Sequence, residues 1–158
     1  MCIRDRQKKV LRKHDGEALT NPNFLNISQH FGFCGRQGHH QLKFGDFKIV
    51  LRSAGKYVEW SVERLRKISA NERNFDPKMW TTNHEERCPV MLFKEYITHR
   101  PRAMCLADSP FWLAINHNPS NGKFLRSQKM GIKKISRFMK AIVAVSYTHL
   151  TLPTKLEV

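Results

Sequence analysis

The sequence predicts an α+β fold that is mainly helical and carries one small antiparallel β-hairpin. Two observations predict this class. Apolar residues recur every three or four positions over 24–31 and again over 135–142, which is the spacing of an amphipathic helix. Between these stretches, apolar runs over 44–51 and 57–62 flank turn-forming residues at 53–56, which is typical of two paired strands.

The first helix is predicted from its end signals. Residues 20–22 read Thr-Asn-Pro, a capping residue followed closely by proline, which indicates a helix start. The helix should run for about three turns and end near Gly32 and Gly35, because glycine favours the left-handed backbone that closes a helix. A second short helix is predicted over 37–42.

The middle of the chain predicts the hairpin and then a basic loop. Strands are expected over 44–51 and 57–62. The segment after the second strand is rich in cations and poor in apolar residues, so we expect a loop there, followed by a short strand around 79–81.

The last third predicts two more helices and a buried strand. Glu85 and Glu86 precede Cys88 and Pro89, which places acids at the positive end of a helix that should stop before Arg100. Residues 111–115 are expected to form a short buried strand and 116–122 a loop. The final helix carries cations opposite its apolar face. We expect the three tryptophans to lie in the core: Trp60, Trp80 and Trp112.

The two ends of the chain look like translations of the two strands of one short DNA sequence. One back-translation of residues 1–6 has a reverse complement that encodes Val-Ser-Tyr-Thr-His, the sequence of residues 145–149. A sequencing adapter read in both directions would produce this pair, so we expect residues 1–6 and 145–158 to be adapter-derived rather than native. Residues 7–144 then form a partial domain, and Tyr147 and His149 carry no catalytic role.

The charge predicts a polyanionic partner. The formal net charge is +15 at pH 7, and excluding the two end segments leaves +14, because they hold Arg4, Arg6 and Lys155 against Asp5 and Glu157. Nucleic acid is the usual partner for such an excess, with an anionic membrane surface second. No apolar run is long enough to span a bilayer, so we expect DNA rather than a membrane as partner.

Cysteine and histidine usage predicts no metal site. Cys34, Cys88 and Cys105 form an odd, widely spaced set that favours neither a disulfide framework nor a zinc finger. His39 and His40 are interpreted as one packing residue and one surface residue rather than as ligands or acid–base groups.

Several blocks of the chain resemble one family. Residues 30–46 read HFGFCGRQGHHQLKFGD, which is similar to the signature HFGLRGRQEHHxLxWGD of Crypton-type tyrosine recombinases. Domesticated relatives of these enzymes include the C-terminal domain of zinc-finger MYM-type proteins. Further blocks follow in the family's order: YVEW at 57–60, RCPV at 87–90, HRP at 99–101, DSPFWLAIN at 108–116 and MGI at 130–132.

The resemblance implies the N-terminal part of a truncated, phage-integrase-like catalytic domain that takes part in DNA integration and recombination. In this family a tyrosine attacks the scissile phosphate. Two arginines and a histidine stabilise the charge on the phosphoryl oxygens, and a lysine near the hairpin protonates the leaving hydroxyl, without a metal or cofactor. The intact parent would then be a nuclear DNA-binding protein, and assembly into an oligomer on DNA is compatible with this role.

When the family's catalytic residues are matched to positions of this chain, the set is incomplete. Cys34 stands where the family has its first arginine, and Gly38 where it has a glutamate. Arg36 is a candidate to replace that arginine at the phosphate, with a solvated surface arginine as the alternative. Lys67 matches the family's lysine, with a plain loop charge as the alternative. The second arginine, the histidine and the tyrosine belong beyond the last helix, so we expect this chain to be inactive.

The resemblance and the charge together predict a DNA-contacting set: Arg36, Arg64, Arg66, Lys67, Lys133, Lys134 and Arg137. Lys140 shares the face of Lys133, Lys134 and Arg137 on the last helix, and a solvated face is the alternative for these four cations. Two alternatives to an active recombinase as parent stay open. The first is a domesticated, non-catalytic chromatin- or transcription-associated protein, and Cys34 and Gly38 favour this alternative. The second is a basic protein-interaction module without a DNA role.

Overall fold

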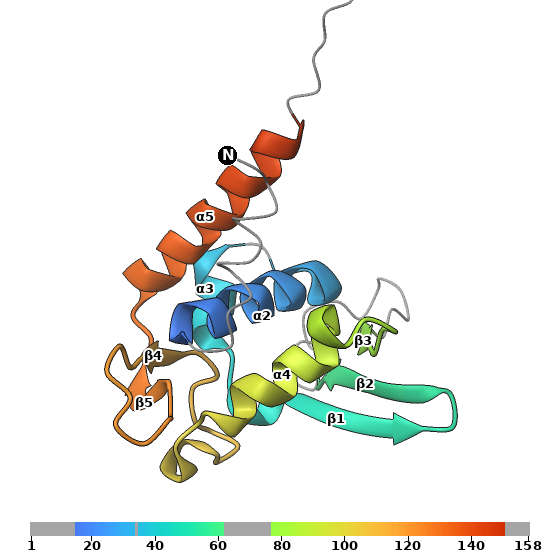
Figure 1. Cartoon of the computed structure of the whole chain (residues 1–158), viewed down its shortest axis with the longest axis horizontal. Helices are drawn as coiled ribbons and strands as arrows, with labels where there is room; N and C mark the ends of the chain where they lie inside the picture. The colour runs from blue at the N-terminus through green and yellow to red at the C-terminus, as the bar shows by residue number, and fades with distance from the viewer. Residues whose placement is uncertain (1–14, 34, 62–76, 151–158) are drawn as a thin grey trace, which may run out of the picture.

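Helices and two small antiparallel sheets build the protein in the order shown in Figure 1, a computed structural model that describes residues 15–33, 35–61 and 77–150. The described helices are α2 (Gly16–Phe31), α3 (Arg36–Gln41), α4 (Pro89–Thr98) and α5 (Ile132–Leu150). The described strands are β1 (Phe47–Arg52), β2 (Gly55–Trp60), β3 (Lys78–Trp80), β4 (Leu113–Ile115) and β5 (Leu125–Lys129). The α+β class is therefore confirmed.

Helix α2 begins earlier than residues 20–22, so the predicted start was wrong. Asp15 is the N-cap, and its carboxylate accepts a hydrogen bond from the Glu17 N–H at 3.2 Å. Thr20 lies inside the helix and donates its hydroxyl to the Gly16 carbonyl at 2.7 Å. Residue 22, the proline, also lies inside α2. The predicted end is confirmed, because Gly32 closes the helix with a φ of 69°.

The predicted second helix and hairpin are both present. Strands β1 and β2 pair from Phe47 opposite Trp60 to Arg52 opposite Gly55. The first strand begins later than predicted, because residues 44–46 form a 3₁₀ turn instead. The Asp46 carboxylate closes that turn by accepting the Lys43 N–H at 2.9 Å.

A third strand completes the hairpin sheet, as predicted around residue 79. Strand β3 pairs with β2, and Met79 lies opposite Val58, with both side chains fully buried. Trp80 points to the other face, where it contacts the ring of Tyr57 and remains 41% exposed. The prediction that Trp80 lies in the core was therefore wrong, because side chains alternate between the two faces of a strand.

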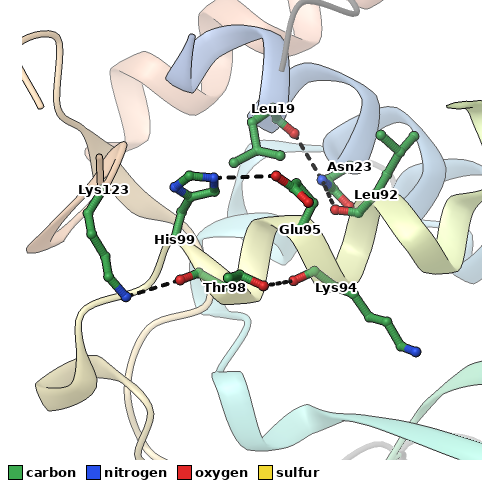
Figure 2. Close-up of polar contacts among 8 residues, drawn as sticks. All are labelled: Leu19, Asn23, Leu92, Lys94, Glu95, Thr98, His99 and Lys123. Carbon is green, nitrogen blue, oxygen red and sulfur yellow. Dashed lines mark hydrogen bonds and ion pairs between the residues drawn. The ribbon is translucent and has the colours of Figure 1, made fainter. Parts of the chain in front are cut away.

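Helix α4 has the predicted bounds. Pro89 is its first residue and Cys88 its N-cap, and the helix ends at Thr98, before Arg100, with His99 as its C-cap. Asn23 joins α4 to α2, because its amide donates to the carbonyls of Leu19 and Leu92 at 2.9 Å each, as Figure 2 shows.

The C-terminal part contains the predicted strand and an unpredicted partner. Strand β4 pairs with β5, with Leu113 opposite Lys129 and Ile115 opposite Leu125. Residues 125–129 read LRSQK, and only Leu125 is buried, so this strand has no apolar alternation to reveal it. Helix α5 continues six residues past Ala144, the predicted boundary of the native segment.

Aromatic side chains build the core where the helices meet the hairpin sheet. Phe111 contacts Phe47, Phe93 and Tyr96, with ring centroids 4.7, 5.7 and 5.5 Å away. Trp112 is only 2% exposed, which confirms its predicted core position. Trp60 is half-buried at the edge of the same cluster.

Candidate nucleic-acid interface

One long segment of the chain holds cations and no acids. No aspartate or glutamate occurs between Asp108 and Glu157. Up to residue 144, this segment carries seven cations: Lys123, Arg126, Lys129, Lys133, Lys134, Arg137 and Lys140. Because β5 and α5 both come from this segment, the positive charge gathers on these two elements.

Helix α5 separates its apolar and cationic residues onto opposite faces. Ile135 and Phe138 are buried. Lys133, Arg137 and Lys140 are exposed, and their spacing of four and three residues places them on one side of the helix. We call these three residues the cationic stripe. None of them has an ion-pair partner among the residues that the structure describes.

Lys134 lies beside the cationic stripe but has a different role. Its ammonium forms an ion pair with the carboxylate of Glu17 on α2 and lies 5.4 Å from the centre of the Phe138 ring. The ion pair compensates the lysine charge and links α5 to α2. Of the α5 residues predicted to contact DNA, Lys134 is therefore the least available.

Arg36 joins the cationic stripe from another element. It is exposed at the start of α3, which packs against α5. Between the two helices lies an open hollow of about 490 Å³, lined by Arg36, Ser136, Met139, Lys140 and Ala144. The fold thus brings together Arg36 and Lys140, which are far apart in the sequence.

Of the two histidines of α3, His39 has the predicted packing role, whereas His40 is only partly exposed. His39 is buried, and its burial lowers its pKa to about 4. His40 is half-buried, and its pKa is lowered by burial and by the nearby charge of Lys129.

Several predicted site residues lie outside the described residues. They are Cys34, Arg64, Arg66 and Lys67. Their predicted roles stay predictions.

Sequence reasoning missed three contributors to this surface. Arg126 and Lys129 are exposed on β5, which the sequence did not predict as a strand. Ser136 was also missed, because one serine within a cationic run has no distinguishing signal. The sequence did predict the cations of the last helix, but residues 125–129 gave no sign that Arg126 and Lys129 lie on a strand.

The described residues contain neither a metal-binding cluster nor a membrane-spanning helix, and the chain matches no known protein. Within the described segments, no three His, Cys, Asp or Glu side chains gather closely enough to hold a metal ion. No helix among the described residues is long and apolar enough to cross a bilayer. No protein-family model, curated protein or solved structure matches the chain.

Proposed function

We propose that the protein binds DNA through the cationic stripe and Arg36. The observation that carries this proposal is the face of α5, where Lys133, Arg137 and Lys140 are exposed without ion-pair partners in the described part of the chain. A cation that no neighbouring carboxylate neutralises keeps its charge for contact with a phosphate. Such contacts release condensed counterions, which drives binding without base specificity.

The dimensions of the cationic stripe suit a nucleic-acid backbone. Lys140 follows Lys133 by seven positions, which corresponds to about 10 Å along a helix at 1.5 Å per residue. This length equals the rise of about three base pairs in duplex DNA. Arg36 widens the surface beside Lys140, so the proposed surface offers four cations to the phosphates of DNA.

The resemblance set out above supports a more specific proposal. The chain corresponds to the N-terminal part of a tyrosine-recombinase-like catalytic domain from a nuclear protein of DNA integration or recombination. Its own role is DNA binding without catalysis, because Cys34 replaces the family's first arginine. A cleavage assay that trapped covalent DNA on this chain would overturn the proposal.

A domesticated, non-catalytic chromatin protein is the second candidate for the parent, and Cys34 and Gly38 favour it. Reverting Cys34→Arg in the intact parent separates the two candidates. Strand transfer by the revertant would indicate a recently decayed recombinase. Its absence, with DNA affinity retained, would support the binding role.

The DNA-binding proposal is tested by charge-matched triple variants. In one, Lys133, Arg137 and Lys140 become glutamine. In the control, Arg52, Arg87 and Arg102 become glutamine; all three are exposed and lie outside α3, β5 and α5. We expect the first variant to lose most of its affinity for a 20-base-pair duplex in fluorescence anisotropy and the control to retain it. Equal losses would show that only total charge matters, and unchanged affinity in both would overturn the proposal.

A further inference from the structure

Ser136 differs from the other serine and threonine residues in the described helices whose side chains are placed. Thr20, Ser28 and Thr98 each donate to the carbonyl four residues earlier, at 2.7, 2.7 and 2.9 Å. Such bonds are the usual arrangement for a helical hydroxyl. The Ser136 hydroxyl makes no hydrogen bond to any of the described residues, and its side chain is half-buried in the wall of the hollow.

The hollow therefore gathers three donors that an anion could use together. Arg36 offers a guanidinium fork, Lys140 an ammonium group and Ser136 a hydroxyl, and none of the three has a side-chain partner in the described part of the chain. A guanidinium and an ammonium with a hydroxyl match the oxygens of a phosphate group. No acid from segment 109–144 opposes an anion there.

The rest of the wall is apolar. Met139 packs against the hydrophobic core and also lines the hollow, together with Ala144. A ligand that fits both parts carries a phosphate at one end and a flat apolar surface at the other. A thioether contacts aromatic rings favourably, and a volume of about 490 Å³ lies within the range of small-ligand sites.

We propose that the hollow is a subsite for one unpaired nucleotide of the bound DNA. Its phosphate contacts Arg36, Ser136 and Lys140, and its base lies on Met139. This inference rests on the proposed DNA-binding function and deepens it. In a duplex, the bases are stacked inside the helix, so only an unpaired or terminal nucleotide brings its base to an apolar wall beside the phosphate site.

The test uses the whole chain and a single deoxynucleoside 5′-monophosphate as probe. Methionine methyl groups are ¹³C-labelled, and the Met139 signal is assigned with a Met139→Leu variant. We expect the Met139 methyl signal to shift during the titration, because a base ring contacts it. Deoxyribose 5-phosphate, which lacks the base, should bind at the same phosphate site but more weakly. An unshifted Met139 signal, or equal affinity for both probes, would overturn the subsite.

Variants separate this inference from the DNA-binding proposal. Ser136→Ala and Arg36→Gln should each weaken mononucleotide binding by about tenfold, as expected for loss of a hydrogen bond to a charged group. Lys133→Gln, on the cationic stripe but outside the hollow, should weaken duplex binding without changing the Met139 shift. A duplex that binds while the mononucleotide does not would overturn the subsite alone. Loss of both would overturn the two proposals together.

Discussion

The imidazole of His39 stacks on the ring of Phe24, with ring centroids 3.9 Å apart and the planes inclined by 19°. The hydrogen bonds around it determine its tautomer. The Ser28 hydroxyl donates to the Phe24 carbonyl at 2.7 Å, so it accepts from the Nε2–H of His39 at 2.8 Å. Nδ1 is then unprotonated, buried and without a partner in the described part of the chain. His39 is a neutral core residue at pH 7.

This burial predicts that stability falls with acid. Burial lowers the pKa of His39 from 6.5 to about 4, so between these values the unfolded chain binds a proton that the folded chain does not. Above pH 6.5 the neutral His39 does not reduce the free energy of unfolding. As the pH falls from 6.5 towards 4, proton binding by the unfolded chain reduces the free energy of unfolding, by up to about 3 kcal/mol. Urea denaturation of the wild type and His39→Gln at several pH values should show the stability difference between them shrinking in acid. Parallel pH curves would contradict this account.

Arg100 is predicted to be essential for stability. It is 1% exposed, and it donates to the carbonyls of Phe111, Met104 and Pro110. Arg100→Met would remove the donor of the Met104 and Pro110 carbonyls, whereas the Phe111 carbonyl would keep the Tyr96 hydroxyl, and we expect a loss of about 3 kcal/mol in the free energy of unfolding. The exposed neighbour Arg102 provides the control, since Arg102→Met should change stability by less than about 0.5 kcal/mol. Similar losses in both variants would show that the hydrogen bonds of Arg100 do not stabilise the fold.

The Lys134–Glu17 ion pair is predicted to contribute modestly. Both side chains are partly exposed, at 32% and 42%, so solvent screens their attraction. A double-mutant cycle with Lys134→Gln and Glu17→Gln should give a coupling energy of about 0.5–1 kcal/mol by thermal denaturation, decreasing in salt. Lys134→Gln should also reduce duplex affinity less than Lys133→Gln, because Glu17 already compensates its charge. The reverse order of affinities would place Lys134 at the DNA instead.

The salt dependence of DNA binding predicts how many phosphates the surface contacts. With contacts from Arg36 and the three residues of the cationic stripe, the slope of log affinity against log salt should be about −4. Each single glutamine substitution among these residues should make the slope about one unit shallower. Anisotropy titrations between 50 and 200 mM salt measure this directly, and a slope that does not change in any single variant would exclude direct contacts.

Two glycines should respond oppositely to alanine. A Cβ at Gly38 would meet the Phe33 ring at 3.4 Å, and alanine is the better helix former, so Gly38→Ala should stabilise the protein by about 0.5–1 kcal/mol. A Cβ at Gly45 would lie 2.8 Å from the Ala107 carbonyl oxygen, so Gly45→Ala should destabilise it by about 1–3 kcal/mol. Melting temperatures of the two variants provide the test, and a shift of the same sign in both would contradict the packing described.

The elements that the sequence predicted correctly have strong local signals. Gly32 ended α2 because glycine adopts a φ of 69° without strain, and Pro89 opened α4 because a first helical residue needs no N–H bond. The hairpin followed from its apolar runs and turn. The start of α2 was mispredicted because Asp15 caps it, whereas residues 20–22 only imitate a cap.

The amino-acid sequence by itself determined the fold class, the position of the hairpin and the concentration of cations in an acid-free segment. These depend on residue type and spacing along the chain. Tertiary structure decided which cations remain available. It paired Lys134 with Glu17 and placed Arg36 beside Lys140 across the hollow. Contacts between residues distant in sequence depend on how helices pack, and no local periodicity encodes that packing.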